Sequence, residues 1–314
     1  MSTVTDDDSV VPMSAQERRP LNTALRQQRV RAWYPILDPW WVICSFVILS
    51  AIFIPVGFKI QSLSDTVVEE IREYDAFDLE PDGECRIGDN AKASQKTGQT
   101  CTVTVPINKA IRPPILIHYQ LENFYQNHRK YMRSRDDFQL AGQVNNQYPL
   151  QAGNCQPLNV INGIRINPCG LIANTLFNDV ISLQEGSIAA DGTPLVMLED
   201  GIAWQSDLQY LYNQPDGFNA APCSDQENLE TCCVGDEWSC EEPYLYKDGK
   251  YYEYYYPNDN TTQYSYETYP EVINPVDGIV NEHFAVWMRV AALSKFRKLY
   301  GWIDQPIAAG TNLT

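Results

Sequence analysis

One long uncharged segment near the N-terminus dominates the hydrophobic pattern. Residues 39–58 contain no charged side chain. As a helix rising ~1.5 Å per residue, this run would cross the ~30 Å hydrocarbon core of a bilayer. A signal peptide would have a shorter apolar stretch and a small-residue cleavage site, and a core helix seldom holds so long an uncharged run. We predict a transmembrane helix over residues 39–60, surrounded by membrane lipids, that extends outward and then turns before residue 80.

Beyond this segment the apolar runs become short and are separated by Pro, Gly and Asn. This punctuation favours strands and loops up to about residue 270. Apolar and polar residues alternate over residues 115–121, which predicts a buried strand. Tyrosine-rich runs within residues 244–256 flank Asp248-Gly249, a pair that accepts the backbone angles of a tight turn. We predict a β-hairpin there, with its tyrosines half-buried in strands.

A helix outside the membrane is predicted over residues 281–300. Asn281 can cap its start and Gly301 can end it. The segment is apolar enough to suggest a second membrane span, but Arg289 and three later cations would each cost ~2.5–3.5 kcal/mol near the bilayer centre. Those three cations, which would instead suit the last turns of a soluble helix, are Lys295, Arg297 and Lys298.

Charge indicates how the chain is oriented across the membrane. The formal net charge is -17, yet residues 1–38 have equal numbers of acids and bases, so the acidic excess follows the apolar segment. Arg26, Arg29 and Arg31 precede that segment, and the positive-inside rule therefore predicts a cytoplasmic, flexible tail over residues 1–38. Residues 61–314 would then lie in the lumen or outside the cell. The acidic balance argues against nucleic acid as a partner.

Cysteines and sequons agree with an oxidising compartment. Cys44 lies inside the apolar segment, and the eight other cysteines all follow it, an even number suited to disulfides. A zinc site is the alternative for the four cysteines of residues 223–240, but its adjacent cysteines lack the usual spacer. Asn260 and Asn312 begin Asn-x-Thr sequons and are predicted glycosylation sites. The predicted disulfide cysteines are Cys85, Cys101, Cys155, Cys169, Cys223, Cys232, Cys233 and Cys240.

Motifs for catalysis are missing from the sequence. There is no phosphate-binding loop, dinucleotide fingerprint, zinc-protease helix or nucleophile elbow. His118, His128 and His283 lack the spacing of a metal pair, so each is interpreted as a surface or structural histidine. We predict no catalytic residues, no metal and no cofactor, which disfavours a membrane-anchored hydrolase. A cell-surface receptor or adhesion ectodomain would share the anchor, disulfides and sequons, and stays open as an alternative.

Four segments, in this order after the anchor, carry a resemblance to one family. They are YQLENFYQNHRKYMRSRD (residues 119–136), PCGLIANTLFND (168–179), IAWQSD (202–207) and NEHFAVWMRVAALSKFRKLYG (281–301). The chain resembles the cell division control protein 50 (Lem3-type) family, the β-subunits of type-IV P-type ATPases that move phospholipids. The match extends over most of the chain.

The resemblance implies a mainly β ectodomain, built on antiparallel β-sheets with short helices and held by the disulfides Cys85–Cys101 and Cys155–Cys169. It implies a non-catalytic accessory subunit that forms a heterodimer with a type-IV P-type ATPase and escorts it out of the endoplasmic reticulum. The expected location is the endoplasmic reticulum, Golgi, endosomes or plasma membrane. Family members resemble two-span proteins, whereas this sequence has no second apolar run before Thr314, so we expect it to stop short of the second span.

The stretch that follows residues 115–121 is predicted to help build the ATPase-binding surface. The chain turns polar there, and amides, aromatics and an arginine suit an interface hot spot better than an active site. The alternative is that the amides satisfy internal backbone groups and the aromatics belong to the core. The predicted partner-binding residues are Asn123, Phe124, Tyr125, Gln126, Asn127 and Arg129.

Overall fold

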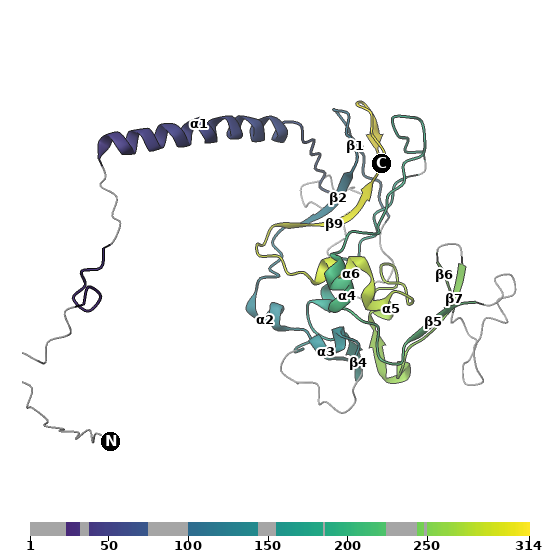
Figure 1. Ribbon diagram of the computed structural model, residues 1–314. Coiled ribbons are helices and arrows are strands. Elements are labelled where there is room, and N and C mark those ends of the chain that lie inside the picture. Colours follow the sequence, from purple (N-terminus) through teal and green to yellow (C-terminus); the bar gives the residue numbers. More distant parts are fainter. Residues whose placement is uncertain are drawn as a thin grey trace, which may run out of the picture. The chain divides into compact units, whose positions relative to one another are not determined.

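The computed structural model divides the chain into two units. The first is Met1–Val67 and the second, here called the folded domain, is Val68–Thr314. The first unit contains one long helix, and the folded domain contains short helices and strands (Figure 1). The described residues are 23–31, 38–74, 100–143, 155–184, 186–223, 244–247 and 250–314.

Helix α1, Pro39–Ser64, is the one described helix long and apolar enough to cross a membrane. It starts at a proline, whose missing N–H costs nothing in the first turn, and it ends four residues beyond the predicted boundary. None of its apolar stretch is buried against the protein. The predicted long helix is confirmed, and it is not a core helix of the described chain.

The folded domain consists mainly of short strands in small sheets. The sheet orders are β1-β10, β2-β9, β3-β4-β8 and β5-β7-β6. The β4–β8 pair is parallel and the other described ladders are antiparallel, so the expected antiparallel architecture is confirmed with one mixed sheet. The strands are β1 Val105–Pro106, β2 Ile115–Leu121, β3 Val160–Ile161, β4 Ile164–Asn167, β5 Asn219–Pro222, β6 Tyr244–Lys247, β7 Lys250–Tyr255, β8 Thr262–Tyr264, β9 Phe296–Ile303 and β10 Asn312–Leu313.

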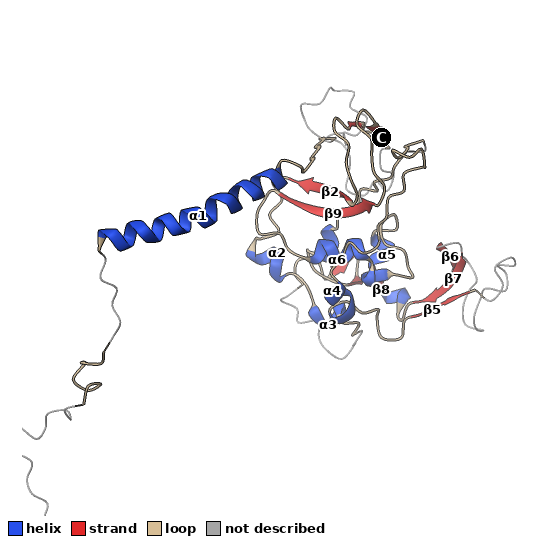
Figure 2. Ribbon diagram, turned by 45° about the horizontal axis from the view of Figure 1, so that its top comes forward, coloured by secondary structure: helices blue, strands red, loops and turns tan. Residues whose placement is uncertain are grey.

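The short helices of the folded domain gather on one side of the β2–β9 ribbon (Figure 2). None of these helices exceeds seven residues, so each depends on packing rather than on its own propensity. The α-helices are α2 Arg129–Arg133, α3 Asp137–Leu140, α4 Gln205–Tyr210, α5 Ser265–Thr268 and α6 Glu282–Met288, and the 3₁₀ helices are η1 Ala173–Thr175, η3 Asp259–Thr261 and η4 Gly278–Val280.

Two predicted β elements are confirmed. Strand β2 has the predicted bounds, although only Tyr119 is fully buried and the other inward side chains are half-buried. Strands β6 and β7 form the predicted hairpin, because Lys247 pairs with Lys250 and leaves a two-residue connection. The connecting Asp248-Gly249 pair lies outside the described residues.

The predicted helix over residues 281–300 is wrong in its second half. Asn281 caps the start as expected, since its Oδ1 accepts a hydrogen bond from the Phe284 amide at 3.1 Å. The helix ends at Met288, however, and residues 296–303 form β9 against β2. Burial there falls mainly on alternate residues, as in a strand. Cross-strand pairing therefore overrides the helical spacing of the cations.

Gly301 has a different role from the predicted helix stop. It lies within β9, where the backbone of Leu198 and the side chain of Met197 pass close by. A Cβ at this position would come within 2.9 Å of the Leu198 carbonyl oxygen. Glycine is needed here for close approach of two chain segments.

A cluster of aromatic and aliphatic side chains forms the main core. Trp287 and Phe284 of α6 are at its centre, each at most 1% exposed. The Trp287 indole N–H donates to the Ile172 carbonyl at 2.8 Å, so the polar atom of the largest core side chain is satisfied. Strand β9 joins this core to a second, aliphatic cluster, since it contributes Tyr300 to the first and Ile303 to the second.

Candidate partner-binding surface

The four segments that carry the family resemblance meet in the main core. Segment 281–301 is joined to each of the other three segments by a hydrogen bond or ion pair, and segment 119–136 is also joined to segment 168–179. The joining contacts are Tyr131 to Thr175 at 2.8 Å, Trp287 to Ile172 at 2.8 Å, Arg289 to Asp207 at 2.5 Å and the Ala291 amide to Gln126 at 2.8 Å. The resemblance therefore marks the scaffold of the fold, and only its exposed members are available to a partner.

Phe124 and Gln126 point into the scaffold. The Phe124 ring makes edge contacts with Tyr131, Trp287 and Phe296 at centroid distances of 5.6–6.2 Å. Gln126 is fully buried, and its Oε1 accepts from the Ala291 amide. These two of the six predicted partner-binding residues have structural contacts, which supports the alternative interpretation for them.

The amides of this stretch shape and fix its turn. Asn123 adopts a positive φ of 58°, a left-handed conformation that asparagine tolerates better than most residues. The Asn127 side chain donates to the Ala292 carbonyl at 2.8 Å. The chain thus leaves β2 in a fixed direction, and residues 123–127 are tied to residues 291–292.

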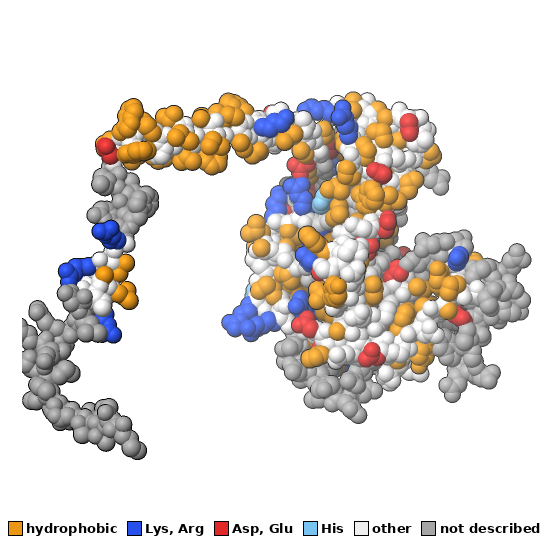
Figure 3. All heavy atoms as spheres, viewed as in Figure 1, with side chains coloured by type: hydrophobic (Ala, Val, Ile, Leu, Met, Phe, Trp, Pro, Cys, Tyr) orange, Lys and Arg blue, Asp and Glu red, His pale blue; other side chains and the backbone are white. Residues whose placement is uncertain are grey.

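The outward side chains are Tyr125 and Arg129. Tyr125 is 59% exposed, and Arg129 is exposed at the first position of α2. Lys130 and Arg133 are exposed on the same short helix, and Lys and Arg side chains gather at this edge of the domain (Figure 3). An aromatic beside three cations stands out in a chain of net charge -17.

The sequence interpretation missed the loop that completes this surface. Residues 289–295 connect α6 to β9 and lie against residues 123–127, where the Phe124 amide also donates to the Ser294 carbonyl at 3.2 Å. Leu293 of this loop is strongly exposed. Both loops belong to segments that carry the family resemblance, and this was the sequence signal that could have identified the second loop. Their contact depends on the pairing of β2 with β9, which the sequence interpretation did not predict. We call Tyr125, Arg129, Lys130, Arg133 and Leu293 the loop-pair surface.

Arg289, the first residue of this loop, is fixed by an ion pair. Its guanidinium binds the nearly buried Asp207 carboxylate through two hydrogen bonds of 2.5 and 3.0 Å, and its carbon lies 4.9 Å from the ring centroid of Trp204. The hydrogen bond to Asp207 raises the pKa of Arg289 further above its already high value. The pair fastens α4 to the end of α6.

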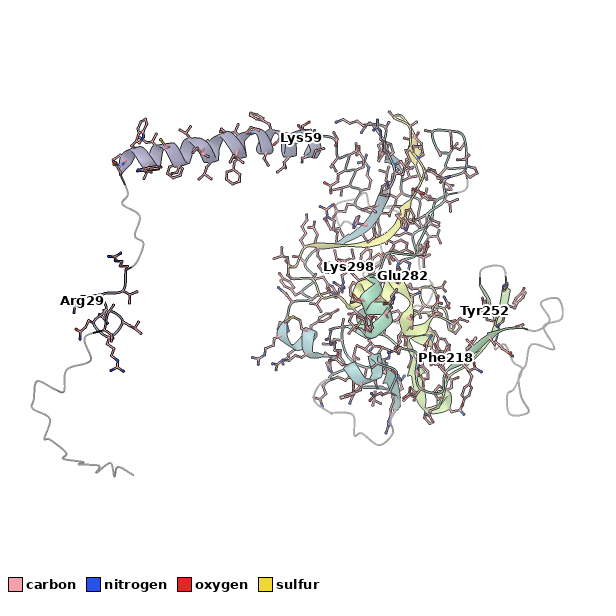
Figure 4. All side chains as sticks on the ribbon, viewed as in Figure 1. Arg29, Lys59, Phe218, Tyr252, Glu282 and Lys298 are labelled. Atoms are coloured by element: carbon pink, nitrogen blue, oxygen red, sulfur yellow. A yellow bond between two sulfur atoms is a disulfide. The ribbon has the colours of Figure 1, made fainter. Side chains whose placement is uncertain are left out.

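Lys298 closes the C-terminal end of α6 from the neighbouring strand (Figure 4). Its ammonium group is buried and donates to the carbonyls of Val286, Trp287 and Arg289 at 3.1, 2.6 and 2.7 Å. These carbonyls would otherwise lack helical partners. Burial lowers the pKa of Lys298 to about 7. The sequence predicted Lys298 in the last turns of a helix. It lies instead in strand β9, from which it reaches the end of α6.

The disulfide prediction is confirmed where the described residues test it. Cys155 and Cys169 are bonded, with a Cα–Cα distance of 5.5 Å, and Cys44 is a free thiol. Cys101 and Cys223 are each disulfide-bonded. The remaining predicted cysteines, whose pairings stay predictions, lie outside the described residues and are Cys85, Cys232, Cys233 and Cys240.

The described histidines do not form a cluster. His283 lies 2.9 Å from Glu199 and packs on Tyr300, while His128 precedes α2 at the surface. Within the described ranges, the residues with metal-ligand spacing are Asp136 and the bonded pair Cys155 and Cys169. Because both sulfurs are in a disulfide, this group has no thiolate to offer a metal.

Asn260 and Asn312 are both exposed. Asn260 lies in η3 and Asn312 in β10. Their side chains are therefore accessible as glycan attachment points, and glycosylation at each stays a prediction.

A long apolar helix joined to a mainly β, disulfide-bonded domain defines this chain as a membrane protein with a large ectodomain. Residues 60–314 match the LEM3 (ligand-effect modulator 3) family, also called the CDC50 family, and the chain belongs to it. The resemblance carried by the four segments is therefore confirmed.

Named relatives come from animals, plants and fungi. Cell cycle control protein 50A of Bos taurus is 33% identical over 292 residues, which cover 93% of this chain and 71% of the relative. ALA-interacting subunit 3 of Arabidopsis thaliana is 32% identical over 299 residues, or 94% and 70% of the two chains. The phospholipid-transporting ATPase accessory subunit CDC50 of Chaetomium thermophilum is 30% identical over 342 residues, or 97% and 76%.

Proposed function

We propose that this chain is the non-catalytic accessory subunit of a type-IV P-type ATPase that moves phospholipids, and that it supports the folding, export and activity of that ATPase. The observation that carries this proposal is family membership over residues 60–314, together with a relative named as an ATPase accessory subunit. The core that joins the four resemblance segments supports this proposal, because family members with the same core can present the same surface to the same kind of partner.

The loop-pair surface is the proposed contact with the ATPase. Exposed aromatic and arginine side chains are typical of interface hot spots, and the surface is held rigid by the buried Gln126 and by Asn127. Preorganised loops lose little conformational entropy on binding. The cations Arg129, Lys130 and Arg133 favour an acidic partner surface.

The proposed orientation places the N-terminus in the cytoplasm and the ectodomain in the lumen or outside the cell. Bonded cysteines in the ectodomain support an oxidising compartment, and the arginines before α1 support a cytoplasmic tail. The proposed route runs through the endoplasmic reticulum to the Golgi, endosomes or plasma membrane. Treatment with a glycosidase should lower the apparent mass of the chain. An added protease should digest the ectodomain on intact cells if it lies outside the cell, and sealed vesicles should protect the ectodomain from the protease if it lies in the lumen.

Co-purification with alanine variants tests the proposed interface. Changing Tyr125 and Arg129 together to Ala should reduce recovery of an aspartyl-phosphate-forming ATPase about 10-fold, because hot-spot truncations cost ~1–2 kcal/mol or more. Gln126 is left unchanged, since its loss would disturb the core. The Cys155–Cys169 disulfide and the glycan pattern should remain as in the unchanged chain.

Tyr210→Ala is the matched control. Tyr210 is also a strongly exposed tyrosine, but it lies on α4, and its loss should leave ATPase recovery within about 2-fold of the unchanged chain. Normal recovery with the Tyr125/Arg129 double variant would remove the loop-pair surface from the interface. Failure of the unchanged chain to bring down any such ATPase would contradict the function itself.

A further inference from the structure

Trp204, in the resemblance segment IAWQSD, is exposed to solvent although it is the largest apolar side chain of that segment. Ile202 and Ala203 before it are buried, whereas Trp204 is 66% exposed. A tryptophan that stays outside the core forgoes the large gain from burying its ring. The fold therefore leaves this side chain available to a partner.

The backbone that carries Trp204 is fixed. The amides of Gly201 and Ala203 donate to the two carboxylate oxygens of Glu282, the first residue of α6, at 2.9 and 2.8 Å. The Trp204 carbonyl accepts a hydrogen bond from the Asp207 amide at 2.9 Å in the first turn of α4. Helix α4 lies beside α6 (Figure 1), so Trp204 is held at the junction of these two helices.

Arg289 fixes the orientation of the indole ring. Its guanidinium carbon lies 4.9 Å from the centroid of the Trp204 ring, and its two hydrogen bonds to the nearly buried Asp207 hold the guanidinium in place. A cation over an aromatic face attracts the ring electrostatically. Because the ring and its backbone are both fixed before binding, Trp204 should lose little conformational entropy in a complex.

The position of Trp204 is continuous with the loop-pair surface. Arg289, which holds the ring, is the first residue of the loop 289–295, and Leu293 of the loop-pair surface belongs to the same loop. That loop is in turn bonded to the buried Gln126. Trp204 and the loop-pair surface are therefore attached to one fixed loop.

Charge distinguishes Trp204 from the rest of this surface. The positive charge of Arg289 is neutralised by Asp207, so this pair adds no net charge beside the indole. Attraction between exposed charges is screened by salt, whereas burial of apolar surface does not depend on charge. The cations of the loop-pair surface, which should respond to salt, are Arg129, Lys130 and Arg133.

We propose that Trp204 is an apolar anchor of the ATPase-binding surface, which packs against an apolar side chain of the ATPase, and that Arg289 positions its ring. This inference rests on the proposed function. Tryptophan is enriched at interface hot spots. The three cations supply salt-dependent attraction to the ATPase, and Trp204 supplies a contact that salt does not weaken.

Recovery of the ATPase with the full chain, measured at about 0.1 M and about 0.5 M salt, tests the anchor. Trp204→Ala should lower recovery about 10-fold at both concentrations, because a hot-spot side chain is lost and no charge changes. Trp204→Phe, which keeps an aromatic ring, should stay within about 3-fold of the unchanged chain. The thermal unfolding midpoint of the ectodomain should not change, since the indole is exposed.

Lys130→Gln together with Arg133→Gln is the matched comparison for charge. Both side chains are exposed on α2, so their loss should lower recovery about 3- to 5-fold at the lower salt concentration and less than about 2-fold at the higher one. Tyr210→Ala, which removes another exposed aromatic ring, should stay within about 2-fold at both. A Trp204→Ala deficit that shrinks at higher salt would argue against an apolar contact.

A double-variant cycle tests the role of Arg289. Arg289→Lys keeps the charge but loses the planar, two-point contact with Asp207, and should lower recovery about 3-fold when Trp204 is present. In the Trp204→Ala chain the same change should cause no further loss, because Arg289 acts through the indole ring. Equal losses from Arg289→Lys in both chains would refute its positioning role.

Failure of the anchor and failure of the proposed function give different results. Normal recovery with Trp204→Ala, while the Tyr125/Arg129 double variant loses the ATPase, would overturn the anchor alone. A lowered unfolding midpoint of Trp204→Ala together with lost recovery would also overturn it, because Trp204 would then act through the fold. Absence of an aspartyl-phosphate-forming ATPase with the unchanged chain would contradict the proposed function, and the anchor with it.

Discussion

Helices α1 and α6 are both apolar, yet their side chains face opposite environments. No residue of α1 is buried against the protein, whereas four of the seven residues of α6 are buried in the main core. At ~1.5 Å per residue, α1 is long enough for a bilayer and α6 is not. Cations follow α6 at Arg289 and Lys298, where a membrane span would continue apolar. Length and flanking charge, rather than apolarity, separate a membrane helix from a core helix.

The largest expected effect comes from truncating the central side chain of α6. Trp287→Ala should lower the free energy of unfolding of the ectodomain by ~3–5 kcal/mol, because it leaves a cavity and an unsatisfied Ile172 carbonyl. Thermal unfolding of the full chain in detergent, followed by near-ultraviolet circular dichroism, measures this change. Trp41→Ala in α1, where the indole is 71% exposed, should leave the same transition unchanged. Equal effects of the two variants would contradict the contrast between the helices.

A charge in the middle of α1 is expected to have the next largest effect. Leu49→Lys should cost ~2.5–3.5 kcal/mol of membrane insertion, and carbonate extraction should release a measurable share of the chain. Leu293→Lys places the same charge on an exposed loop of the ectodomain and should leave extraction unchanged. Retention of the Leu49→Lys chain in the membrane to the same extent as the original would argue against α1 as the span.

The C-terminal end of α6 gives a smaller and pH-dependent effect. Lys298→Met should destabilise the ectodomain by ~1–3 kcal/mol at pH 7, because three buried carbonyls lose their donor. The pKa of Lys298 is lowered to about 7 in the folded chain and is ~10.4 in the unfolded chain. Between these two pH values the unfolded chain binds more protons than the folded chain. The stability of the original chain should therefore rise with pH relative to the variant.

Unfolding midpoints measured from pH 6.5 to 9.5 on both chains test this linkage. The difference between them should widen as the pH increases above 7. Parallel midpoints would mean that the three carbonyls keep the ammonium charged in the folded state, against the effect of burial.

The smallest expected effect concerns the helix starts. Asn281→Ala should cost ~1 kcal/mol, since the side chain caps the Phe284 amide. Asp38 stands at the equivalent position of α1 but makes no side-chain cap, so Asp38→Ala should not change helix stability by this route. A shift of the ectodomain midpoint for Asn281→Ala alone would confirm that capping matters for the short helix only.

The sequence by itself determined the elements whose pattern is local. Twenty uncharged residues predicted α1, alternation predicted β2 to the residue, and the Asp248-Gly249 pair predicted the β6–β7 hairpin. Predictions from the length of an apolar segment and from the period of its hydrophobic residues do not depend on residues elsewhere in the chain. The family resemblance added the Cys155–Cys169 bond, which spacing alone left open.

Tertiary structure decided the features that depend on contacts between distant segments. Residues 289–303 left the helical pattern because β9 gains a full ladder with β2, and Lys298 became a buried cap because that ladder places it under α6. The same pairing turned Phe124 and Gln126 inward and left Tyr125 and Arg129 outside. A sequence of polar and aromatic residues does not say which side chains face a partner, because burial is set by the segment that packs against them.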